Sequence, residues 1–152
     1  MSTRVRSYGW FAAAVFLACS PIAARAAARE MPLIEAVRRG DAAAVRTLLP
    51  QADVNAPQDD GTTALHWAVH LDKAAIVDLL LKSGANPNAA NRYKMTPLAL
   101  AGTNGNAGII ERLLKAGVDA NSTIAGGETA LMAAARADRV DAVKVLLTDR
   151  KS

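Results

Sequence analysis

Apolar residues in the part of the chain after about residue 30 recur at intervals of three and four positions. Leu65, Ala68 and Val69 form one such group, and apolar positions within 76–81 form a second group a few residues later. This spacing predicts two short amphipathic helices in succession, the second running from about Ala74 to Lys82. Polar residues and glycines separate the groups, so we expect helix pairs joined by short turns.

The ends of these helices are marked by residues with known capping behaviour. Thr63, Thr96 and Thr129 are expected to be N-caps, and Pro97 occupies a first helical position, where its missing N–H costs nothing. Left-handed turns are predicted at residues that tolerate this conformation. Between the two helices of a pair they are Gly40, Asp72, Gly105 and Asp138. After the second helix they are Gly84 and Gly117.

The pattern repeats at one fixed interval along the chain. The three threonines are evenly spaced, and the leucine pairs that begin at Leu80, Leu113 and Leu146 keep the same spacing. A period of about 33 residues is typical of repeat proteins, in which each helix pair buries its apolar face against its neighbours. The small residues Ala68 and Ala101 are expected to let adjacent first helices approach closely.

The residues of each unit resemble the ankyrin family. The segment from Gly61 to Ala68 (GTTALHWA) resembles the opening G-x-T-P-L-H-x-A of its repeat, and the segment from Leu79 to Asn88 (LLLKSGANPN) resembles the closing L-L-L-x-x-G-A-x-x-N. The resemblance implies an all-α fold, an ankyrin-repeat solenoid of stacked helix-turn-helix units with hairpin loops. The expected solenoid contains about 3.5 to 4 repeats, at about 31–58, 59–91, 92–124 and 125–152, the last incomplete.

The two terminal units depart from this pattern. In the first, Leu33 stands one position closer to Leu65 than Leu65 stands to Leu98, and the threonine cap is missing, as expected of an N-terminal capping repeat. The last keeps apolar residues at the inward positions of an internal repeat, namely Leu131, Ala134, Val143 and Leu147, so its outer face has no polar cover. We therefore expect either a longer array or docking of this end on a partner or a second copy.

Residues 1–26 are predicted to be a signal peptide, which leaves a repeat domain over 27–152. Arg4 and Arg6 form a charged start, and the segment 10–19 (WFAAAVFLAC) is apolar but too short to span a bilayer. Ala24 and Ala26 supply the small residues of a cleavage site. The mature chain is then exported, to the periplasm of a bacterium or outside the cell. An uncleaved anchor and a lipoprotein acylated at Cys19 are the alternatives.

The composition of the chain argues against nucleic-acid binding and against thiol chemistry. The chain carries 18 basic and 14 acidic residues. Three of the basic residues lie in the signal peptide, so the mature chain has a net charge of about +1 and no electrostatic footprint for nucleic acid. Cys19, the single cysteine, also lies in that segment, which leaves the mature chain no thiol for a disulfide, a metal site or a nucleophile.

No motif for a cofactor or for catalysis is recognisable, and no cofactor is expected. His66 and His70 have the i, i+4 spacing of a zinc helix, but Trp67 stands where the general base would follow, so a metal-dependent hydrolase is a distant alternative. The family resemblance instead implies that His66 is structural, bonding backbone and the Thr63 hydroxyl. It places His70 on the concave groove.

The family resemblance implies that exposed positions differing between repeats contact a partner. These positions lie at the ends of the first helices and at the hairpin tips, and they predict a binding module for a protein of unknown identity. A membrane-tethered scaffold is the second hypothesis. The candidate residues are Arg38, Arg39, His70, Leu71, Thr103, Asn104 and Arg136 on the helices, and Asp59, Asp60, Thr62, Arg92, Tyr93, Met95 and Glu128 on the hairpins.

Overall fold

The computed structural model describes residues 32–149, and the predicted signal peptide lies outside this range. Within it, helices follow one another as antiparallel pairs. The pairs are a helix over residues 32–39 with α2 (Ala42–Leu48), α3 (Ala64–His70) with α4 (Ala74–Lys82), α5 (Pro97–Asn104) with α6 (Ala107–Lys115), and α7 (Ala130–Arg136) with α8 (Val140–Asp149).

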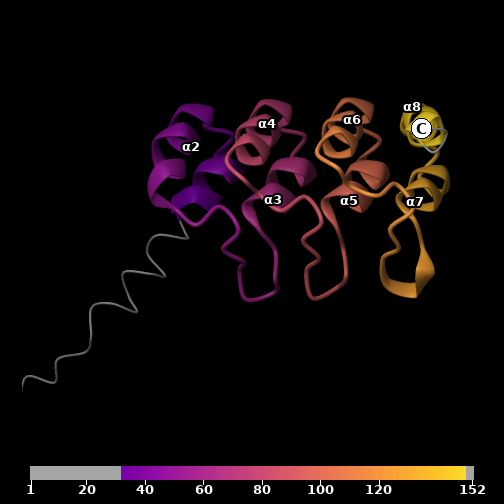
Figure 1. Cartoon of the computed structure of the whole chain (residues 1–152), viewed down its shortest axis with the longest axis horizontal. Helices are drawn as coiled ribbons and strands as arrows, with labels where there is room; N and C mark the ends of the chain where they lie inside the picture. The colour runs from indigo at the N-terminus through magenta and orange to yellow at the C-terminus, as the bar shows by residue number, and fades with distance from the viewer. Residues whose placement is uncertain (1–31, 150–152) are drawn as a thin grey trace, which may run out of the picture.

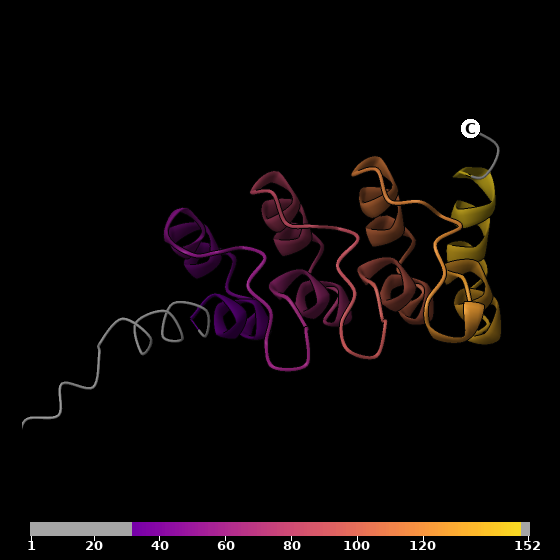
Figure 2. The ribbon, with the colours of Figure 1, turned by 60° about the horizontal axis from the view of Figure 1, so that its bottom comes forward.

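The pairs stack side by side along one axis (Figure 1). The second helices α2, α4, α6 and α8 form one row, and α3, α5 and α7 lie in a second row beneath them. The loops that join consecutive pairs project below the second row as hairpins, which Figure 2 shows from another side. The predicted all-α solenoid of stacked helix-turn-helix units is confirmed.

The predicted helix boundaries are confirmed as well. The hydroxyl oxygens of Thr96 and Thr129 accept from backbone N–H groups three residues on, each at 3.3 Å. Asp72 and Asp138 have φ values of 54° and 56°, in the left-handed region that Gly105 occupies in the third repeat. An aspartate tolerates this conformation because its short polar side chain interacts with the local backbone.

The core runs through the whole stack. Ala68, Ala101 and Ala134 are each fully buried, and they are the small residues that let neighbouring first helices approach. Leu80 and Leu113 occupy equivalent buried positions in the second helices. A leucine buried in this way contributes about 1.5–3 kcal/mol to the free energy of unfolding, so α4 and α6 stabilise the stack through these side chains.

The short first repeat ends differently from the others. Its second helix runs into a 3-10 turn, η1 (Leu49–Gln51), whereas the second helices of the next two repeats end at Gly84 and Gly117, each with a φ of 86°. A 3-10 turn rises further per residue than an α-helix, so Pro50 and its neighbours close the repeat with one residue fewer. The missing residue of the first repeat therefore lies at this helix end.

The outer face of the last repeat exposes apolar side chains. Met132, Val140 and Leu147 are 57 %, 58 % and 46 % exposed. The residue equivalent to Met132 in the third repeat, Ala99, is buried beneath the following helix pair. In the part of the chain that the structure describes, these side chains have no cover. Of the four positions that the sequence predicts to be open, only Leu147 is exposed, whereas Leu131 and Val143 are partly buried and Ala134 is buried. No helix within residues 32–149 is long and apolar enough to cross a membrane.

Candidate protein-binding surface

The predicted contact residues lie on the first helices and on the hairpins beside them. The exposed ones come from both of these elements, and Figure 2 shows that the hairpins lie next to the first helices along the stack. The exposed residues are Arg38, Arg39, Asp59, His70, Arg92, Tyr93, Thr103 and Arg136. The others are less accessible: Asp60, Leu71, Met95, Asn104 and Glu128 are partly buried, and Thr62 is buried.

One position near the end of the first helix is exposed in every repeat. Arg38, His70, Thr103 and Arg136 occupy it, and none of the four is acidic. Basic groups are favoured at this place because the C-terminal end of a helix carries partial negative charge. Thr103 donates to the Ala99 carbonyl at 3.0 Å, and Arg136 pairs with a carboxylate at 2.9 Å. The side chains of Arg38 and His70 form no hydrogen bond within residues 32–149.

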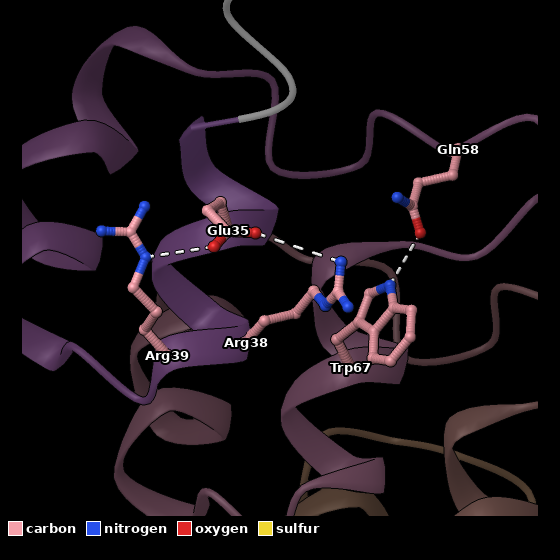
Figure 3. Close-up of polar contacts among 5 residues, drawn as sticks. All are labelled: Glu35, Arg38, Arg39, Gln58 and Trp67. Atoms are coloured by element: carbon pink, nitrogen blue, oxygen red, sulfur yellow. Dashed lines mark hydrogen bonds and ion pairs between the residues drawn. The ribbon is translucent and has the colours of Figure 1, made fainter.

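Arg38 instead lies against Trp67 (Figure 3). The guanidinium carbon of Arg38 is 4.9 Å from the centroid of the indole ring, a cation–π contact between the first and second repeats. The indole is fixed from the other side, since its Nε1–H donates to Gln58 Oε1 at 2.7 Å. Trp67 is thus held by a helix on one side and by the hairpin on the other.

Glu35 lies closer to Arg39 than to Arg38. Arg39 Nε donates to Glu35 Oε1 at 3.2 Å, whereas Arg38 Nη1 is 4.0 Å from Glu35 Oε2 (Figure 3). All three side chains are about half exposed or more. The single carboxylate therefore faces two arginines, and the donors of Arg38 remain open to solvent.

A cleft opens beside Trp67, between α3 and the hairpins. It has a volume of about 200 Å³, and its lining includes Trp67, His70, Asn91 and Leu100. The rings of Trp67 and His70 meet edge to face, with centroids 6.0 Å apart and an interplanar angle of 78°. This combination of aromatic, aliphatic and amide surface suits a side chain inserted from a partner.

Thr62 is not the exposed tip residue that the sequence predicts, because it folds the hairpin. Its side chain is 9 % exposed. Its N–H and its hydroxyl donate to the two carboxylate oxygens of Asp60, each at 2.9 Å. These hydrogen bonds, the backbone one first, lower the pKa of Asp60 below 3.8 and keep a negative charge at the cleft wall.

Arg92 joins adjacent hairpins. Its N–H donates to the Asp60 carbonyl at 2.7 Å, and its guanidinium donates to the Asp59 carbonyl. The next residue, Tyr93, is 69 % exposed, more than any other large hydrophobic side chain of the described chain. Arg92 therefore has a structural role in addition to the contact role that the sequence predicts.

Asn104 also links two repeats. Its amide nitrogen donates to the carbonyls of Val69 and His70, at 3.1 and 3.2 Å. The last carbonyls of α3 are thereby satisfied by the next repeat. Asn104 stabilises the stack at this position, and its side chain has little left to offer a partner.

His66 is structural, as the family resemblance implies. Its Nδ1 accepts from the Thr63 N–H at 3.2 Å and lies 2.9 Å from the Thr63 hydroxyl, so the ring proton is on Nε2, which donates to the Met95 carbonyl at 3.0 Å. Burial lowers the pKa of His66. Both nitrogens are occupied, and residues 32–149 contain no group of three or more side chains able to hold a metal.

Glu35, Gln58 and Trp67 belong to this surface but were not among the predicted residues. The sequence contains a signal for Trp67 and Glu35. Trp67 and Glu35 stand at one repeat position, next to the exposed row, where Leu100 and Ala133 follow in later repeats. A position that varies from glutamate to tryptophan is a candidate contact, although the family motif marks it only as unspecified. Gln58 had no signal, because its contact depends on the course of the hairpin.

Comparison with known proteins now identifies the fold family. A model of ankyrin repeats in three copies matches residues 11–91 and 76–152. The chain belongs to the ankyrin-repeat family. Ankyrin repeats generally mediate protein–protein interaction through extended concave surfaces, and proteins built from them are generally binding modules rather than enzymes.

Relatives with this domain are much longer proteins. An ankyrin repeat domain-containing protein, SAT10, of Stachybotrys chartarum is 39 % identical over 76 % of this chain and 6 % of its own length. The neurogenic locus notch homolog protein 1 of Xenopus tropicalis is 38 % identical over 69 % of this chain and 4 % of its own. The 2-5A-dependent ribonuclease of Mus musculus is 44 % identical over 46 % of this chain and 10 % of its own. The ankyrin chain spans a small part of each.

Proposed function

We propose that this ankyrin-repeat chain is an exported bacterial module that binds a segment of another protein across its concave surface. The observation that carries the proposal is the cluster around Trp67, where Arg38 and His70 keep unused donors beside an open cleft. Tyr93 adds an exposed aromatic side chain at the hairpin tips. Tyrosine, tryptophan and arginine are the residues that most often dominate binding energy at interfaces.

The proposal of export is supported by the amino-terminal sequence. A charged start, a short apolar run and the Ala24-x-Ala26 site predict cleavage after residue 26 and a mature domain over 27–152. Expression in a bacterial host with periplasmic extraction should yield protein that begins at Ala27. Exported protein whose sequence begins at Met1 would contradict it.

Binding can be tested without knowing the partner by site-specific photo-crosslinking. A photoreactive phenylalanine analogue at Tyr93, on the hairpin tip, is compared with the same analogue at Lys115, which is exposed on α6. In envelope extracts of the source organism, the Tyr93 probe should give a discrete adduct that the Lys115 probe does not. Crosslinking that is equal at both positions would show that the concave surface is not the site.

A triple variant then tests the named residues. Substitution of His70, Arg92 and Tyr93 by Ala should weaken binding of the crosslinked partner by at least about 1 kcal/mol if any one of them is a hot spot. Arg92 also joins hairpins, so the thermal transition is measured in parallel. A variant that folds like the native chain and binds equally well would place the interface elsewhere.

A further inference from the structure

The side chains around Trp67 define the chemistry of the segment that is bound, an inference that rests on the proposed function. Arg38 makes a cation–π contact and one long ion pair, and its five N–H donors form no hydrogen bond within residues 32–149. The stacking on Trp67 orients the planar guanidinium in advance, so less conformational entropy is lost when it binds an anion.

Neighbouring charges reinforce this chemistry. Glu35 is hydrogen-bonded to Arg39 and stands 4.0 Å from Arg38, so two arginines share one carboxylate. His70 contacts the same indole ring edge to face, and its side chain is exposed. The exposed row that contains Arg38 and His70 has no acidic residue within the described repeats. Along this row, therefore, no carboxylate competes for the donors of Arg38, and the nearest one is Glu35 at 4.0 Å.

The cleft beside Trp67 has the opposite character. Asp60 lines it, and Leu100 provides an apolar wall. The Asp60 carboxylate accepts from Thr62, which keeps it ionised, and it would repel an acidic side chain there. A bound chain therefore fits best with a neutral or apolar side chain in the cleft and its acidic group at Arg38.

We propose that the ligand is an acidic peptide segment whose aspartate or glutamate carboxylate pairs with Arg38 while Arg38 stays stacked on Trp67. A neighbouring apolar side chain of the same segment enters the cleft beside Leu100. The ion pair is partly exposed, so it contributes to selectivity and to the rate of association, and it weakens as salt is added.

The test uses the full chain carrying Trp10→Phe, so that Trp67 is the single tryptophan. A phage-displayed library of random peptides is selected on this protein, and the most enriched peptide is synthesised and titrated by Trp67 emission. We expect enrichment of Asp or Glu next to an apolar residue. Arg38→Gln should weaken the binding of that peptide about tenfold, the loss of a charge-assisted hydrogen bond. Added salt should weaken it further.

Arg46→Gln is the matched control, because Arg46 is an exposed arginine of α2 away from the Trp67 contact. It should leave binding unchanged. Arg38→Lys keeps the charge and loses the planar stack, and it should fall between the native chain and Arg38→Gln. Circular dichroism of each variant confirms that it is folded.

Two results would overturn the inference. If the selected peptides lack acidic residues, or bind the Arg38→Gln variant as tightly as the native chain, the assigned chemistry is wrong. The proposed function would survive that outcome if Tyr93→Ala still abolished binding. If single-stranded DNA, titrated in the same assay, binds more tightly than any selected peptide, the surface is a nucleic-acid site and both proposals fail.

Discussion

Gly102 of α5 lies directly against the backbone of α7. A Cβ atom at Gly102 would come within 2.7 Å of the Ala130 carbonyl oxygen, closer than real Cβ contacts, and no flexible side chain lies between them that could move away. The third and fourth repeats therefore approach more closely at this point than any larger residue would permit.

Gly102→Ala should accordingly destabilise the chain. The added methyl group forces α5 and α7 apart, and overpacking of this kind costs about 1–3 kcal/mol. Gly108→Ala is the control, because in α6 the nearest atom to a new Cβ is the Arg112 guanidinium at 3.3 Å. That change should be neutral or stabilising by up to about 1 kcal/mol, as expected of alanine in a helix. Urea unfolding of both variants measures the difference, and equal effects would refute the close approach.

Lys94 occupies a backbone conformation that glycine holds elsewhere. Its φ is 56°, and the equivalent residues Gly61 and Gly127 have φ values of 81° and 77°. Lys94→Gly should raise the free energy of unfolding by about 0.5–1 kcal/mol, because the left-handed penalty for a side chain exceeds the entropy cost of glycine. Lys115→Gly, in the last turn of α6, should lower it by up to about 1 kcal/mol. If both variants lose stability in chemical denaturation, Lys94 is not strained.

The contrast between predicted and observed left-handed residues shows what the sequence can tell. Asp72 and Asp138 were predicted because they alternate with glycine at one repeat position and because aspartate tolerates the conformation. Lys94 was not predicted, although Gly61 stands one repeat before it and Gly127 one repeat after it. Comparison between repeats would have identified it, whereas the propensity of lysine alone could not.

The surface was less predictable than the fold, for a physical reason. Repeat register decides which residues are buried, so the helices, their caps and the buried alanines follow from sequence spacing. The contact of Arg38 with Trp67 and the burial of Thr62 depend on side-chain rotamers and on the path of a hairpin. Such contacts cross between repeats and leave no periodic signal, and that is why Thr62 was expected at an exposed tip.

Stability should decline in mild acid because of His66. Burial lowers its pKa in the folded chain, whereas the unfolded chain protonates near 6.5. The unfolded state therefore takes up the proton first as the pH falls. The contribution of neutral His66 to the free energy of unfolding is complete above about pH 6.5. It is lost as the pH drops toward the folded-state pKa of His66.

Denaturant midpoints measured at intervals between about pH 7.5 and about pH 5 test this. The decline should persist in His70→Ala, since His70 is exposed. It should shrink in His66→Gln, which removes the titrating group. The carboxylate of Asp60 titrates only at lower pH, because its pKa is lowered, and so falls outside the window. A profile that is flat in the native chain would contradict the assignment.

The apolar outer face of the last repeat should make the chain self-associate or fray at that end. Met132, Val140 and Leu147 are the exposed residues concerned. Light scattering should detect dimers or larger species, or hydrogen exchange should be faster over 140–147 than over 76–81. Replacing Met132 and Leu147 by Gln should reduce association. A clean monomer with equal protection in both helices would show that the fourth repeat is a competent cap.

Side-chain hydrogen bonds between one repeat and the next join residues at similar separations in the sequence. Asn55 donates to the Gly84 carbonyl, His66 bonds Met95, and Arg112 bonds Asp78, so that each of these links joins residues between 29 and 34 positions apart. Within the described chain the two ends of the stack are therefore connected only through the units between them. If the chain is pulled from its two ends, every junction carries the same force, and the weakest one breaks first. Force spectroscopy should then record successive small ruptures, each releasing about one repeat, rather than a single event for the whole domain.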